Sequence, residues 1–113
     1  DVKAAQLLAP AALAADLDCL TLQSEADVIV SADLPFVADK TGVCCGFCLW
    51  FEVELAGNVK LSTSPSRPPT HWKQSVVMLP EMLGAFPGAR LDCTLSMQPS
   101  EENARHFEIT ISM

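Results

Sequence analysis

The sequence has few basic residues and spreads them thinly. Seven lysines and arginines stand against 14 aspartates and glutamates, which gives a formal net charge of −7 at pH 7. No window gathers enough basic side chains to neutralise several phosphates, and this argues against nucleic acid as a partner. An acidic surface is suited to steering cationic protein segments toward it, although solubility alone also explains such a charge.

Long hydrophobic runs are missing as well. No stretch reaches the roughly 18 apolar residues of a membrane-spanning helix. The alanine-rich start also lacks the basic segment that opens a signal peptide, so the sequence predicts no membrane association. The 113 residues begin at Asp1 without a methionine, which is typical of one domain cut from a larger protein.

Cysteines are odd in number, which fits free thiols in a reducing compartment better than a disulfide framework. We therefore expect a cytoplasmic or nuclear protein. Cys45 and Cys48 form a C-x-x-C, but on one strand residues three apart point to opposite faces. They cannot close on one metal ion or into one disulfide without a bend at Gly46. We predict no metal site, and buried or half-buried structural thiols instead. The five cysteines are Cys19, Cys44, Cys45, Cys48 and Cys93.

Glycines are scattered, and no G-x-G occurs. A dinucleotide-type cofactor is held by a glycine-rich loop after a strand, where the backbone approaches the ligand closely. We therefore expect no cofactor-binding residues within this sequence. Glu101 and Glu102 are adjacent carboxylates in a turn-rich segment, and their position far along the chain from the other candidates argues against a catalytic pair.

The sequence is rich in the two-residue periodicity of β-strands. Apolar and mixed side chains alternate from Cys45 to Leu55, and after an Ala-Gly-Asn turn the alternation resumes over 59–63. These stretches predict a long strand and its antiparallel hairpin partner. The stretches 91–98 and 107–113 alternate in the same way and predict a second hairpin. Shorter strands are expected at 28–30, around Phe36 and at 74–79.

The other segments predict a short helix and a long loop. Alanine and leucine favour a helix near the N-terminus, and Pro10 ends it because proline removes a donor and clashes with the preceding turn. The segment 80–89 holds two prolines and two glycines and is expected to be a surface loop. Residues 1–113 then form one all-β domain, an antiparallel barrel or sandwich of about seven or eight strands with a short N-terminal helix.

A proline pair precedes the most distinctive residues of the chain. Pro68 and Pro69 fix φ and lack N–H groups, so the chain before Thr70 is extended, stiff and unable to continue a sheet ladder. His71 and Trp72 follow at a predicted strand entrance, a place where a rigid scaffold presents side chains to a ligand. The spacing also fits a plainer arrangement, in which Trp72 caps the core and His71 is solvated.

Two segments resemble a known family. "LSTSPSRPPTHWKQSVVMLP" and "GFCLWFEVEL" are similar to the C-terminal β-barrel domain of class I protein arginine N-methyltransferases, whose signature here is a Thr-His-Trp loop followed by Lys-Gln. The five residues from Thr70 to Gln74 match this signature consecutively, and "ENARHFEITI" resembles the family's closing hairpin. The resemblance is strongest from Gly46 to Leu79.

The resemblance implies methyl transfer from S-adenosylmethionine to a guanidinium nitrogen of a protein arginine. In the family, a separate N-terminal domain binds the cofactor, and the substrate arginine lies between that domain and the barrel. By this resemblance Thr70, His71 and Trp72 line the arginine pocket: Trp72 forms a wall, and His71 pairs with an acidic group of the other domain. We then expect basic, arginine-containing protein substrates, a homodimeric parent, and no cofactor binding or activity in these 113 residues alone.

The long predicted strand carries two further candidate site residues, both of them glutamates. Glu52 and Glu54 share the mixed face of the long predicted strand, where they form part of a groove for a basic substrate tail or are simply solvated.

One alternative function is an acidic β-barrel module that binds basic proteins. Another is a catalytically inactive partner that activates a sister subunit.

Overall fold

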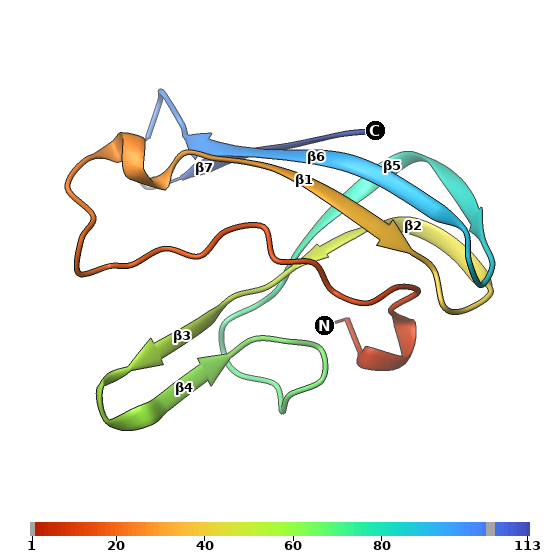
Figure 1. The fold of residues 1–113 in the computed structure, drawn as a ribbon, viewed down its shortest axis with the longest axis horizontal. Helices are drawn as coiled ribbons and strands as arrows, with labels where there is room; N and C mark the ends of the chain where they lie inside the picture. The colour runs from red at the N-terminus through yellow and green to blue at the C-terminus, as the bar shows by residue number, and fades with distance from the viewer. Residues whose placement is uncertain (1, 104–105) are drawn as a thin grey trace. The chain divides into compact units, whose positions relative to one another are not determined.

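The computed structural model describes residues 2–103 and 106–113, which contain seven strands and three short 3-10 helices (Figure 1). Every strand pair is antiparallel, and the ladders form three sheets, in the orders β1-β6-β7, β2-β5 and β3-β4. The predicted all-β, antiparallel fold class is therefore confirmed. The elements are η1 (Ala4–Gln6), η2 (Glu25–Val28), β1 (Val30–Val37), β2 (Gly42–Leu49), β3 (Glu52–Leu55), η3 (Ala56–Asn58), β4 (Val59–Ser62), β5 (Ser75–Ala85), β6 (Arg90–Pro99) and β7 (Phe107–Ser112).

The chain divides into two compact units. The first comprises the N-terminal residues up to Leu8 and Lys40–Phe86, and it contains the β2-β5 and β3-β4 sheets. The second comprises Ala9–Asp39 and Pro87–Met113, and it contains the three-stranded sheet. In that sheet β6 lies between β1 and β7 (Figure 1).

The most buried apolar side chains of the described residues belong to the second unit. They alternate with less buried positions along β1 and β6, as expected for strands with one covered face. Burying an apolar side chain of this size contributes about 1.5–3 kcal/mol. These side chains are Val30, Leu34, Cys93 and Leu95, each 3–7% exposed.

Both predicted hairpins are present, with the expected antiparallel pairing. The β3-β4 hairpin turns through Gly57 and Asn58, which both adopt positive φ (75° and 61°) as tight turns require. The β6-β7 hairpin pairs Leu95 with Ile111 and Met97 with Ile109. Part of its turn, at 104–105, lies outside the described residues.

The prediction of one long strand from Cys45 to Leu55 is wrong. β2 ends at Leu49 and pairs with β5, whereas β3 begins at Glu52 and pairs with β4. Between them Phe51 exchanges hydrogen bonds with Thr63: its N–H donates to Thr63 Oγ1 (3.0 Å) and its carbonyl accepts from the Thr63 N–H (3.0 Å). Side-chain alternation continues through this point, so the pattern could not reveal the change of partner.

The segment 80–89 is mostly strand rather than the predicted loop, because β5 continues to Ala85. Pro80 is tolerated because the β2-β5 register shifts between Cys44 and Gly46. Cys44 pairs with Leu83 and Gly46 with Met78, so Pro80 lies in the irregular stretch where no ladder N–H is required of it.

The two short strands expected near Val28 and Phe36 are one strand, β1, preceded by η2. Pro35 lies within β1, which is tolerated because β1 is an edge strand of its sheet. The predicted N-terminal helix is present as η1, a single turn of 3-10 helix. Among the described residues, no helix has the length and apolarity that a membrane crossing requires.

Candidate functional site

The predicted site residues lie on the loop that joins β4 to β5, which we call the Thr-His-Trp loop and define as residues 64–73. Its neck is formed by Thr63 and Gln74, because the Gln74 side-chain amide donates to the Thr63 carbonyl (3.0 Å). Thr63 is only 5% exposed, and its hydroxyl donates to the Phe51 carbonyl (3.2 Å). A side chain therefore closes the loop where the strand ladder has ended.

Gln74 also binds a second segment. Its Oε1 accepts a hydrogen bond from the Val2 N–H (2.8 Å), and the Cys48 thiol lies 3.8 Å from the same oxygen. Burial raises the pKa of the Cys48 thiol, which favours the protonated form that can donate to Gln74. Gln74 thus joins the loop neck, β2 and the N-terminal segment. The sequence singled out Gln74 only as part of the Lys-Gln signature; a polar residue following Thr-His-Trp at a strand start was the available signal.

Within the loop, Thr70 forms hydrogen bonds with the backbone of Trp72. The Trp72 N–H donates to Thr70 Oγ1 (3.2 Å), and the Thr70 hydroxyl donates to the Trp72 carbonyl (3.1 Å). This local turn is typical of threonine beside its own backbone. The ring centroids of His71 and Trp72 are 3.9 Å apart, with the planes inclined by 32°.

Both rings face solvent rather than the core. The Trp72 side chain is 47% exposed, and His71 is exposed. Trp72 is therefore not enclosed in the core, and His71 is solvated, as the plainer arrangement predicted. β5 begins at Ser75, just beyond the loop, so the three residues stand at a strand entrance as predicted. Their role in binding an arginine stays a prediction.

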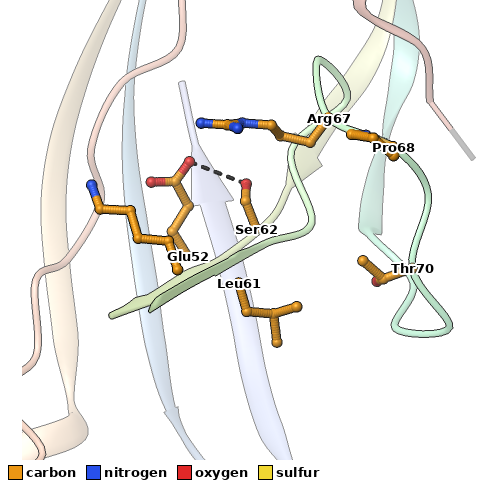
Figure 2. A pocket seen from close by; sticks show the side chains of 7 residues that line it. Glu52, Leu61, Ser62, Arg67, Pro68 and Thr70 are labelled. Carbon is orange, nitrogen blue, oxygen red and sulfur yellow. Dashed lines mark hydrogen bonds between the residues drawn. The ribbon is translucent and has the colours of Figure 1, made fainter. Parts of the chain in front are cut away.

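A surface groove of about 260 Å³ runs beside the loop (Figure 2). It brings together Thr70 and Glu52, two of the residues predicted for the site, and Figure 2 shows Arg67 reaching across the same groove. The Ser62 hydroxyl donates to Glu52 Oε1 (3.1 Å). The groove is lined by Glu52, Lys60, Leu61, Ser62, Arg67, Pro68 and Thr70.

The two candidate carboxylates differ in their surroundings. Glu54 does not line this groove; its Oε1 lies 3.2 Å from Lys60 Nζ in an exposed ion pair. Glu52 lines the groove, whose walls also carry the cations of Lys60 and Arg67. The groove is therefore of mixed charge and not a purely acidic channel.

Trp72 lines a second, larger hollow of about 460 Å³ with Gln74, Pro69 and Lys3 among its walls. Arg67, Pro68 and Thr70 belong to the walls of both hollows. The Thr-His-Trp loop therefore contributes to two hollows, and His71 belongs to the lining of neither.

The cysteines do not all match their prediction. Cys93 is buried, and Cys44 and Cys48 are half-buried, but Cys19 and Cys45 are exposed. Cys19 lies in a segment outside the helices and strands, and Cys45 lies at the irregularity of the β2-β5 ladder. Within 2–103 and 106–113, no group of three or more His, Cys, Asp or Glu side chains is placed to hold a metal ion.

Known proteins are similar to this chain in sequence and in fold. The chain is 34% identical over 99 residues to protein arginine N-methyltransferase 6 of Danio rerio, covering 85% of this chain and 28% of that protein. It is also 34% identical over 88 residues to the histone-arginine methyltransferase CARMER of Drosophila yakuba, covering 75% of this chain and 16% of the relative. The chain thus spans well under a third of the length of these relatives.

A solved structure has the same fold. It is described as the "Trypanosoma brucei PRMT1 enzyme-prozyme heterotetrameric complex with AdoHcy" and aligns with a TM-score of 0.86 at 24% identity, covering 97% of this chain and 36% of that one. The family model of the arginine methyltransferase oligomerization subdomain matches residues 1–113. Because that match runs the full length of the sequence, the chain belongs to the arginine methyltransferase family as its C-terminal oligomerization subdomain.

Proposed function

We propose that this chain is the substrate-side barrel part of a protein arginine N-methyltransferase, and that the Thr-His-Trp loop helps to bind the substrate arginine. The observation that carries the proposal is the exposed ring pair of His71 and Trp72, held by Thr70 at a strand entrance in a chain of this family. The similar proteins are named as arginine methyltransferases, which supports this role.

The chemistry of a guanidinium explains why these side chains suit the role. The group is planar and stays charged at neutral pH, so it needs partners that orient it without removing its proton. An aromatic face such as that of Trp72 contributes about 0.5–2 kcal/mol through cation–π attraction. We assign His71 to pairing with an acidic group outside this chain, where it positions the substrate and does not act as the base.

The rest of the reaction belongs to residues outside this sequence. We propose that S-adenosylmethionine is bound by another domain of a longer protein, of which these residues span a part comparable to 28% of the zebrafish relative. The 113 residues alone are then inactive, and the parent protein acts as a homodimer on basic, arginine-containing proteins in the cytoplasm or nucleus. Of the two carboxylates, Glu52 is the better candidate for guiding a basic tail, because Lys60 already neutralises Glu54.

Substitution of the two rings tests the proposal. In the full-length protein, Trp72→Ala and His71→Ala should each lower kcat/KM for an arginine-glycine-rich peptide about tenfold or more, as the loss of an oriented contact to the substrate predicts. Trp72→Phe should retain more activity than Trp72→Ala, because it keeps an aromatic face. His106→Ala is the matched control, since His106 is exposed and lies outside the loop.

Normal kcat/KM in both alanine variants would show that the loop does not form the arginine pocket. Circular dichroism of each variant checks that the fold is kept. Incubation of the 113-residue chain with labelled S-adenosylmethionine and the same peptide tests the proposed division of labour, and turnover there would contradict it.

A second candidate function is that of an inactive partner subunit. It is favoured by the similar solved structure, which is described as a complex of an enzyme with a prozyme. The full reading frame distinguishes the two. A G-x-G-x-G segment and paired glutamates upstream favour an active enzyme, and degenerate versions of them favour the activating partner. If neither is present, an acidic binding module is favoured.

A further inference from the structure

The start of the Thr-His-Trp loop carries a motif that the proposed function does not use. Residues 64–67 read Ser-Pro-Ser-Arg, a serine followed by proline and, at the third position after the serine, by a basic residue. Kinases of the proline-directed, cyclin-dependent class recognise this pattern. They accept a following proline because it has no N–H to leave unpaired, and they bind the basic side chain with acidic groups or phosphate.

The structure presents this serine in a form that a kinase can use. Ser64 lies beyond the end of β4, in a loop without regular structure, and is partly exposed. Its Oγ lies 2.9 Å from Ser66 Oγ and accepts a hydrogen bond from the Ser66 N–H (3.2 Å). No strand ladder has to open for residues 64–67 to become extended, because the hydrogen bonds of this turn are local ones, including the bond from the Arg67 N–H to the Ser64 carbonyl (3.0 Å).

The surroundings also suit a phosphate once it is attached. The Ser64 N–H donates to Ser62 Oγ (3.2 Å), and Ser62 lines the groove together with Lys60, Arg67 and Glu52. Ser64 itself lines the second hollow, whose walls also carry the cations of Lys3 and Arg67, whereas Lys60 is already paired with Glu54. The Ser66 N–H is a further donor at the serine oxygen itself, and the Ser66 hydroxyl lies 2.9 Å from it. A phosphoserine placed near such donors forms one to three charge-assisted hydrogen bonds and orders the loop that carries it.

We propose that Ser64 is a phosphorylation site for a proline-directed kinase that requires a basic residue three positions later. In the reaction, Ser64 Oγ forms a bond to the γ-phosphorus of ATP while the bond from that phosphorus to the bridging oxygen of ADP breaks. The hydroxyl proton passes to the catalytic aspartate of the kinase, and ADP leaves. The product places a dianion at the base of the Thr-His-Trp loop, in the hollow that Lys3 and Arg67 also line.

The test uses the full-length protein with a purified cyclin-dependent kinase–cyclin pair and ATP. Mass spectrometry of the tryptic peptide 61–73 should find one phosphate, with fragment ions placing it on Ser64. Initial rates should fall about tenfold or more in Pro65→Ala and Arg67→Ala, since each removes one recognised feature. Ser64→Ala should abolish labelling of the peptide, whereas the matched control Ser66→Ala should be labelled at close to the wild-type rate.

Wild-type protein that carries no phosphate in peptide 61–73, or carries it on Ser62, Thr63, Ser66 or Thr70, would overturn the proposal. The wild-type measurement needs no variant, so a variant that fails to fold leaves this outcome decisive. None of these readouts depends on methyl transfer. The phosphorylation proposal and the proposed function can therefore fail separately.

Discussion

The three-stranded sheet and the Thr-His-Trp loop are stabilised by different kinds of interaction. In the sheet, β1 and β6 bury apolar side chains on one face, and Leu95 is only 3% exposed. The loop has no such layer; it is closed by the Gln74 side chain and shaped by the Thr70 hydroxyl. Apolar burial thus supports the sheet, while a few polar contacts shape the candidate site.

The largest difference between the regions should appear in truncations of apolar side chains. Leu95→Ala in β6 should lower the free energy of unfolding by about 2–5 kcal/mol, because it leaves a cavity in the covered face of the sheet. Val59→Ala in β4 should change it by less than about 0.5 kcal/mol, since Val59 is 54% exposed. Urea denaturation of the purified protein measures both, and equal losses would contradict the comparison.

The next largest effect on stability should come from a glycine of the β2-β5 sheet at which the two strand backbones lie close together. A Cβ on Gly46 would clash with the Val77 carbonyl oxygen, whereas a Cβ on Gly84 of the same sheet would have no atom within 4 Å. Gly46→Ala should therefore cost roughly 1–3 kcal/mol of stability by overpacking. Gly84→Ala should be neutral or slightly stabilising. Thermal unfolding of the pair checks this, and a neutral Gly46→Ala would mean that the strands separate easily there.

Substitution of Gln74 tests whether its side-chain hydrogen bonds hold the Thr-His-Trp loop closed. Gln74→Ala removes the partners of the Thr63 carbonyl and the Val2 N–H, and should cost about 1–2 kcal/mol. Gln74→Glu keeps an acceptor for Val2 but loses the donor to Thr63, so we expect an intermediate cost. Gln98→Ala, at an exposed position of β6, is the matched control and should be nearly silent.

The readout that separates a loop effect from a general one is amide hydrogen exchange. In Gln74→Ala, amides of residues 64–73 should exchange faster while those of β6 keep their protection. Equal acceleration in both regions would show that Gln74 supports the whole fold rather than the loop.

The smallest expected effect is a pH dependence from the buried thiol of the sheet. Burial and the adjacent Asp92 carboxylate raise the pKa of Cys93 above its ordinary value of 9.0. The folded state therefore keeps a proton that the unfolded chain loses. Stability should be unaffected well below pH 9 and should fall slightly as the pH rises through the unfolded value toward the folded one. Urea midpoints of Cys93→Ala, compared with wild type between pH 8 and 10, should lack this slope.

Labelling with iodoacetamide gives a companion measurement. Cys19 and Cys45 are exposed and should react first, whereas Cys93 is buried and should react last. Fast modification of Cys93 in folded protein would indicate that the covered face of the sheet opens readily.

The hairpins show what could be predicted from the sequence, and β2 and β5 show what could not. Alternation over 91–98 and 107–113 specified both strands, because neither strand exchanges one partner for another along its length. The same alternation from Cys45 to Leu55 concealed a break, since the β2-β3 junction exchanges one partner strand for another without disturbing the side-chain period. Pro80 suggested a loop because the shift of register that accommodates it depends on a distant strand.

The candidate site divides in the same way. The sequence by itself determined the stiff Pro68–Pro69 segment, the Thr-His-Trp signature and the strand that follows, because proline dihedrals and short-range alternation are local properties. Only the tertiary structure decided that His71 and Trp72 face solvent, that Glu52 and Thr70 line one groove, and that Gln74 closes the loop. Those features depend on which distant backbone atoms come within hydrogen-bonding distance, and no local pattern records this.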